Sequence, residues 1–245
     1  MAGRPLFRCL LVLAGVVAAP QLRAADATSL TPFTEAGADA PAPWHFVGLP
    51  GQTKPKTRFA VVEIDGRKAL RVEAEESYGN LVNPLRVTGT SAHLAWQWRV
   101  DVPIVAADLR TKQGDDTAIK VCVFFDMPLD QVPFVERQLH KIAQSKSDEP
   151  LPTATVCYVW DTSLPIGTEI DNAFTRRMRY IVLESGPTKL RQWKAERRDV
   201  MADFVKLFGA ESAKVPPIIG VAIGADADNT HTRSLGYVAN IVLEP

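Results

Sequence analysis

The chain has 245 residues and a formal net charge of zero, with 28 basic and 28 acidic side chains. No block of Lys and Arg interrupts this balance, so we expect no nucleic acid partner, because phosphate binding needs clustered positive charge. A chain of this length fits one large β domain, and no internal repeat divides it.

The N-terminal segment predicts export from the cytoplasm. Arg4 and Arg8 precede an apolar run from Cys9 to Ala19, and small residues follow up to Ala24. This order is typical of a signal peptide over residues 1–24, and the apolar run is too short for a permanent membrane helix. We therefore expect a periplasmic or secreted protein with no stable membrane span after processing.

Residues 25–43 are rich in Ala, Pro, Thr and Ser, which predicts a flexible lead-in. The remaining residues, 44–245, predict a single β-sandwich domain. Residues 59–64 and 69–74 alternate apolar and polar side chains around Asp65-Gly66, a strong signal for a β-hairpin turn. The same alternation predicts further strands at 93–102, 118–126, 153–161, 177–184, 217–223 and 235–243.

Two segments have helical spacing instead. Residues 131–143 place apolar side chains three and four positions apart, and residues 199–208 do the same before Gly209, a residue typical of helix ends. The apolar side chains of the first segment are Val132, Val135, Leu139, Ile142 and Ala143. The whole pattern predicts an all-β fold, an antiparallel jelly-roll-like β-sandwich with two peripheral helices that pack on its edges or close one end.

Cys122 and Cys157 each stand in the middle of a predicted strand. A disulfide would suit an oxidising compartment, provided that the two strands are neighbours. Buried free thiols are the alternative, because a lone cysteine packs as a small apolar residue. The spacing does not decide between them.

Acidic residues gather where predicted strands begin or end. Asp115, Asp116 and Asp161 are candidate ligand-binding residues of this kind. Asp226, Asp228 and Asn229 follow another strand and offer the oxygen ligands that a calcium ion prefers. Turn formation is the alternative, because Asp and Asn after a strand often bond to their own backbone.

Arginines and one tryptophan supply further candidates. Arg71 and Arg99 lie on polar strand faces, where with Arg179 they could form a receptor for carboxylates such as uronates. Trp193 stands among polar residues and could form an exposed stacking platform for a sugar ring. The alternatives are salt-bridged surface arginines and a lone aromatic residue at the end of a strand or helix.

Several short motifs occur together in a fixed order. They are Leu-Arg-Val-Glu-Ala at 70–74, Trp-Gln-Trp-Arg-Val at 96–100, Gly-Asp-Asp at 114–116, Cys-Tyr-Val-Trp at 157–160, Arg-Asp-Val at 198–200 with Asp-Phe at 203–204, and Asp-Ala-Asp-Asn-Thr at 226–230. Across residues 44–244 the chain resembles the bacterial family called domain of unknown function 3047. The resemblance implies a secreted or envelope-associated β-sandwich, makes the two acidic motifs the best site candidates, and supplies no catalytic residues.

Two classes of function remain open from the sequence. The leading hypothesis is a non-catalytic binding module for a glycan or another envelope component, because no catalytic triad or paired acid–base motif is present. The alternative is a polysaccharide-active enzyme, a lyase or a hydrolase. A lyase would use Arg71 or Arg99 with Tyr78, Tyr158 or His231 as base, and a hydrolase would use two of Asp116, Asp126, Asp161 and Asp228. A structural envelope protein is the third reading.

Overall fold

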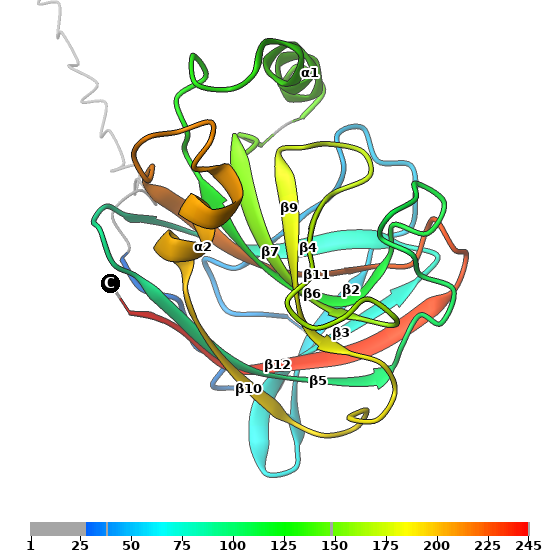
Figure 1. Ribbon diagram of the computed structural model, residues 1–245. Coiled ribbons are helices and arrows are strands. Elements are labelled where there is room, and N and C mark those ends of the chain that lie inside the picture. The colour runs from blue at the N-terminus through cyan, green and yellow to red at the C-terminus, as the bar shows by residue number, and fades with distance from the viewer. Residues whose placement is uncertain (1–27, 38, 148, 245) are drawn as a thin grey trace, which may run out of the picture.

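Two β-sheets lie face to face and enclose the core (Figure 1). The computed structural model describes residues 28–37, 39–147 and 149–244, so the expected signal peptide lies outside the described residues. Within the described part of the chain, no helix is long and apolar enough to cross a membrane. The all-β sandwich with two helices is confirmed.

The larger sheet has seven strands in the order β1-β4-β11-β6-β7-β9-β8. These are β1 (His45–Val47), β4 (Tyr78–Val87), β11 (Ile218–Asp226), β6 (Thr117–Phe125), β7 (Ala154–Asp161), β9 (Met178–Ser185) and β8 (Glu169–Asp171). Every neighbouring pair is antiparallel except β7 and β9, which are parallel. Strand β8 lies in the connection between β7 and β9. It pairs with β9 on the side away from β7 and forms one edge of the sheet.

The smaller sheet has five strands in the order β10-β5-β12-β3-β2, and all of its pairs are antiparallel. These are β10 (Lys194–Asp199), β5 (His93–Val102), β12 (Arg233–Glu244), β3 (Arg67–Glu75) and β2 (Arg58–Ile64). The Asp65-Gly66 hairpin lies between β2 and β3 as predicted, with both turn residues at positive φ.

The core lies between the sheets and is rich in aromatic side chains. Trp96 and Trp98 of β5 point inward and are fully buried, as the alternation predicted. Trp96 packs against Tyr158 with ring centroids 5.2 Å apart, and Trp98 packs against Trp160 at 5.9 Å. These tryptophans therefore stabilise the core by packing.

The two helices differ in how they pack. Helix α2 (Val200–Phe208) is capped by Asp199, whose carboxylate accepts from two backbone N–H groups, and it buries Phe204 against Phe125. Helix α1 (Phe134–Gln144) buries none of its residues. Figure 1 shows it standing away from the body of the sandwich.

The expected burial of the apolar stripe of α1 is wrong. Val132 is buried just before the helix, but Val135, Leu139 and Ile142 are 65%, 52% and 54% exposed. Helical periodicity reports which side chains share a face, and it does not supply a surface for that face to contact.

The lead-in also differs from its expectation of flexibility where the structure describes it. Leu30 and Phe33 belong to the buried core, and Phe33 packs against Trp44 with ring centroids 5.2 Å apart. The backbone N–H of Thr31 donates to Asn83 in β4. Leu30, Thr31 and Phe33 are thus held to the sandwich by packing and a hydrogen bond.

Candidate functional site

A polar cavity of about 370 Å³ opens on the outer face of the seven-stranded sheet. It lies where β11 ends and where β4 and β6 begin, so three neighbouring strands bring their terminal side chains together. The lining residues are Leu49, Tyr78, Asp115, Lys120, Asn172, Phe174, Thr175, Met178, Tyr180, Asp226, Asp228 and Asn229. Strand alternation explains the placement of Lys120, because its neighbours Ile119 and Val121 point into the core.

A buried ion pair forms the floor of this cavity. Lys120 Nζ lies 2.9 Å from Asp226 Oδ2, and the two side chains are 1% and 5% exposed. The other carboxylate oxygen of Asp226 accepts from the N–H and the hydroxyl of Thr117. Burial alone would lower the pKa of Lys120, but the negative charge of Asp226 and its hydrogen bond raise it above the usual value. Lys120 is therefore a fixed cation, 5.0 Å from the ring centroid of Tyr78.

Asp115 shares the cavity but has only uncharged donors as direct partners. Asn172 donates its amide to one oxygen, and the Tyr180 hydroxyl lies 3.4 Å from the other. Burial and the charge of Asp226 raise the pKa of Asp115 to about 7, although Lys120 and the two donors act in the opposite direction. Asp115 can therefore hold or release a proton near neutral pH.

Asp228 presents an unsatisfied acceptor. Its Oδ1 atom is buried and has no hydrogen-bond partner among the described residues. Burial, followed by the charges of Asp226 and Asp116, raises the pKa of Asp228. A buried polar atom without a partner costs free energy, which a donor group on a ligand would recover.

Asp116 does not line the cavity, but it holds two of its loops together. Its carboxylate accepts from the backbone N–H groups of Asn229 and Thr230 and from both of their side chains. Gly114 lets the loop before β6 pass close to Asp108, because a Cβ atom at position 114 would lie 2.7 Å from the backbone nitrogen of Asp108. In the Gly-Asp-Asp motif, Gly114 thus allows the close approach, Asp115 lines the cavity and Asp116 holds the loop at Asn229 and Thr230 in place.

The residues proposed for calcium serve other contacts in this structure. Asp226 is paired with Lys120, and Asn229 bonds to Asp115 and Asp116, so a calcium ion would have to displace an ammonium group. Among the described residues, no group of three or more His, Cys, Asp or Glu side chains is placed to hold a metal ion. These contacts join residues more than 100 positions apart, so they differ from the local turn bonds of the alternative, and the calcium site stays a prediction.

Asp161 and the predicted arginine receptor lie elsewhere. Asp161, at the end of β7, accepts from the backbone N–H groups of Ser163 and Leu164 and shapes a turn. Arg71 pairs with Glu73, and Arg99 pairs with Asp65 and Asp101. Both arginines belong to the five-stranded sheet, whereas Arg179 belongs to the seven-stranded sheet, so the three cannot form one receptor.

Trp193 is not a free platform. It packs on the outer face of the five-stranded sheet beside Tyr237, with its ring N–H donating to Asp65 and the Arg67 guanidinium 4.7 Å from its ring centroid. That face is on the far side of the sandwich from the polar cavity. In this structure Arg71 and Arg99 are therefore salt-bridged, and Trp193 packs on the sheet.

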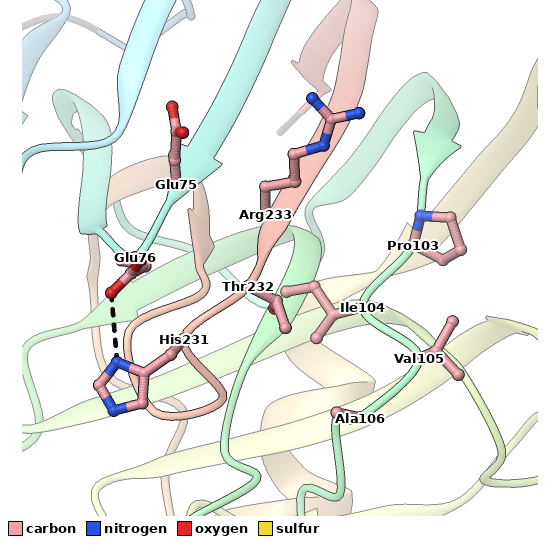
Figure 2. A pocket seen from close by; sticks show the side chains of 9 residues that line it. All are labelled: Glu75, Glu76, Pro103, Ile104, Val105, Ala106, His231, Thr232 and Arg233. Carbon is pink, nitrogen blue, oxygen red and sulfur yellow. Dashed lines mark ion pairs between the residues drawn. The ribbon is translucent and has the colours of Figure 1, made fainter.

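His231 lies in a separate, open hollow of about 590 Å³ (Figure 2). Its Nδ1 atom is 3.4 Å from a carboxylate oxygen of Glu76, and both side chains are largely exposed. Figure 2 shows this pair at one side of the hollow, with Val105 and Pro103 at the other. His231 therefore does not join the carboxylates of the polar cavity.

Sequence reasoning missed Lys120, Asn172 and Tyr180 as site residues. One signal for Lys120 was available, because it is the only charged residue between Thr117 and Phe125, a strand that is otherwise mostly apolar. Asn172 and Tyr180 come from β9 and the loop before it, which reach the cavity only through the strand order.

A disulfide lies beside the cavity floor. Cys122 of β6 and Cys157 of β7 stand opposite each other and are bonded, which resolves the question that their spacing left open. Cys157 is in turn paired with Tyr180 across β7 and β9. The disulfide thus joins the central strands on the side that carries the cavity.

Comparison with known proteins gives a family. The model of a family described as "Protein of unknown function (DUF3047)" matches residues 42–242. The chain belongs to this family. No curated protein matches the chain.

The solved structures that match the chain have low identity and TM-scores below 0.5. The family 12 xyloglucanase from Bacillus licheniformis in complex with ligand has 7% identity and a TM-score of 0.46, over 89% of this chain and 100% of that one. Endoglucanase 3 of Trichoderma harzianum, from family GH12, has 12% identity and a TM-score of 0.39, over 83% and 98%. The xyloglucanase domain of NopAA from Sinorhizobium fredii, in complex with cellobiose, has 6% identity and a TM-score of 0.40, over 84% and 99%.

Proposed function

We propose that this member of the DUF3047 family is an exported binding protein for a glycan or a related envelope component, and that the polar cavity holds the sugar. The observation that carries the proposal is the buried, unpartnered Oδ1 atom of Asp228 in the cavity lining. Sugar hydroxyls are donors and acceptors at once, so they match a lining that offers both.

The cavity supplies the complementary groups. Lys120 is a donor, the Asp115 and Asp228 carboxyls are acceptors when ionised, and the Tyr180 hydroxyl can serve as either. Phe174, 55% exposed at the cavity wall, offers an apolar face for a pyranose ring. The volume of about 370 Å³ lies within the range of small-molecule sites. The disulfide supports the proposed export, because disulfides persist in oxidising compartments.

The test is calorimetric titration of the protein and of Asp228→Asn against a panel of neutral and acidic saccharides. A hydrogen bond to a charged group contributes about 1.5–3 kcal/mol, so the variant should bind the active saccharide roughly tenfold to a hundredfold more weakly. Asp126→Asn is the matched control, because this carboxylate is exposed and pairs with Arg86 outside the cavity. Binding that is unchanged in Asp228→Asn, or no binding to any saccharide, would refute the proposal.

A second candidate function is acid–base hydrolysis of a glycoside in the same cavity. The observation that favours it is the contrast between two carboxyl groups, since the pKa of Asp115 is raised to about 7 while Asp226 is ion-paired with Lys120. Such a contrast is typical of an acid and a base that share one reaction. New reducing ends released from a polysaccharide, and lost in Asp115→Asn, would establish the enzyme; binding without product would leave the binding protein.

A further inference from the structure

A second cavity, of about 380 Å³, adjoins the polar one and has a more apolar lining. It lies between the outer face of the seven-stranded sheet and helix α1. Its apolar wall is formed by Val47, Leu49, Leu139, Ala143, Leu151 and Met178. We call it the apolar arm, and the cavity around Lys120 the polar arm.

The two arms adjoin each other. Five residues line both of them, namely Leu49, Tyr78, Phe174, Thr175 and Met178. A ligand that enters the polar arm therefore meets aliphatic surface at its other end.

Several polar groups in the apolar arm have protein partners, whereas the Arg177 Nε atom has no hydrogen-bond partner among the described residues. The His140 ring bonds to the carbonyl of Leu151 at 3.2 Å, and Arg177 forms a 2.6 Å ion pair with Glu211. A peptide in this arm would need partners for its own backbone N–H and C=O groups. A hydrocarbon chain needs none, so the lining favours a hydrocarbon.

Helix α1 supplies an apolar wall that nothing else in the described structure covers. Leu139 lines the apolar arm and is still 52% exposed, and no residue of α1 is buried. An apolar chain lying against Leu139 would remove this surface from water, which is a favourable free-energy change.

We propose that the ligand is an amphiphile, with a hydroxylated saccharide head in the polar arm and an alkyl or acyl chain in the apolar arm. This inference rests on the proposed function and names the class of ligand for the same site. The lining residues that the two arms share are its main support, and a glycolipid or an acylated sugar has the required chemistry.

The experiment titrates the protein with maltose, glucose and galactose, with their n-decyl glycosides below the critical micelle concentration, and with n-decylphosphocholine, which has the chain without the sugar. Each buried methylene contributes about 0.8 kcal/mol, or roughly fourfold in affinity, so four buried methylenes should make a decyl glycoside more than about a hundredfold tighter than its free sugar. The decyl glycoside should also bind more tightly than decylphosphocholine.

Two variants on α1 distinguish binding in the apolar arm from binding elsewhere on the helix surface. Leu139→Gln should weaken decyl glycoside binding several-fold and leave free-sugar binding unchanged, because this residue lines the apolar arm. Val135→Gln is the matched control on the same helix, 65% exposed and outside the cavity lining, and should bind both like the parent protein.

The outcomes are distinguishable. Equal affinity for free sugar and decyl glycoside overturns the amphiphile and leaves the saccharide site standing. Equal affinity for decyl glycoside and decylphosphocholine, with no binding of free sugar, overturns the saccharide head and with it the proposed function. Self-association in light scattering that is lost in both α1 variants would assign the apolar wall to a second copy of the chain and overturn the amphiphile.

Discussion

Two carboxyl groups in one cavity have different electrostatic surroundings. Asp226 is paired with Lys120 inside the protein, whereas Asp115 has Asn172 and the Tyr180 hydroxyl as its direct partners. A carboxylate with a buried cation beside it and a carboxyl group with only neutral donors respond differently to pH, so substitutions at the two positions should have different consequences.

Asp115→Asn should alter how stability depends on pH. The pKa of Asp115 is raised from 3.8 to about 7, so the folded state holds a proton that the unfolded state has already released between these values. The free energy of unfolding therefore falls as pH rises from about 4 to 7, by about 2–4 kcal/mol at most for this group. Asparagine cannot titrate, so the variant should gain stability relative to the parent over this interval.

The measurement is urea denaturation of both proteins at several values between pH 4 and pH 8. Other groups titrate equally in the two proteins, so the difference in the free energy of unfolding isolates Asp115. A difference that does not change with pH would show that Asp115 has an ordinary pKa.

Lys120→Met should be strongly destabilising. Removing one partner of a buried ion pair leaves the other charge uncompensated, which typically costs about 3–5 kcal/mol. The double variant Lys120→Met, Asp226→Asn should regain most of this loss, because no buried charge is left. Equilibrium denaturation at pH 7 tests both variants. A free energy of unfolding that does not change in Lys120→Met would mean that water or another group solvates Asp226.

Residue types in motifs indicated part of the site but not its supporting contacts. The acidic motifs contained Asp115, Asp226, Asp228 and Asn229, which do line one cavity. The sequence could not separate Asp116 from Asp115, because the choice between supporting a loop and facing a ligand depends on the loop at residues 227–230, more than 100 positions away. The arginines have partners closer in the chain, because Arg71 pairs with Glu73 and Arg99 with Asp101, each two positions away.

At the scale of elements, the disulfide joins two strands of the same sheet. Cys122 and Cys157 are separated by 35 positions, and a cross-link of this span stabilises a protein by about 3–4 kcal/mol in the chain-entropy model. Chemical denaturation with and without a thiol reductant should show a loss of this order. The variant Cys122→Ala, Cys157→Ala should not respond to the reductant, and a parent protein that also fails to respond would contradict the prediction.

The two helices should also differ in their sensitivity to substitution. Phe204 of α2 is fully buried, so Phe204→Ala should cost about 3–5 kcal/mol through loss of apolar burial and creation of a cavity. Ile142 of α1 is 54% exposed, so Ile142→Gln should change the free energy of unfolding by less than about 0.5 kcal/mol. Thermal denaturation measures both, and a large loss in Ile142→Gln would mean that α1 packs on the protein in solution.

Strands were predictable where one face is buried and the other is wet. Strand β5 alternates over its whole length and was located at its observed bounds. Strand β4 was missed because Pro84 and two asparagines interrupt its pattern, and Pro84 is tolerated beyond the end of β1, where β4 becomes an edge strand. Strand β10 was missed because an edge strand of six mostly charged residues has no apolar period.

At the scale of the whole molecule, the two outer faces are chemically separate. Trp193 packs on the outer face of the five-stranded sheet, and the polar arm lies on the outer face of the seven-stranded sheet. Trp193→Ala should therefore leave saccharide affinity unchanged, while Asp228→Asn lowers it. Titration of both variants with the same saccharide tests this, and a loss of affinity in Trp193→Ala would place binding on the other face.

The sandwich architecture followed from alternation, but strand order did not. The parallel pair β7 and β9 places Tyr180 and Asn172 within reach of Asp115, and nothing in a local pattern indicates that pairing. The site is therefore a product of topology, because its parts come from β4, β6, β11 and the segment around β9.

The bond between Cys122 and Cys157 has a further consequence for the proposed binding, since it joins the two strands beside the polar arm. Lys120 is two residues away on the same strand, and Tyr180 faces Cys157 on the next. A receptor whose base is cross-linked keeps its bound shape while vacant, and capture then costs little ordering entropy. Reduction should consequently weaken ligand capture even under conditions where the protein remains folded.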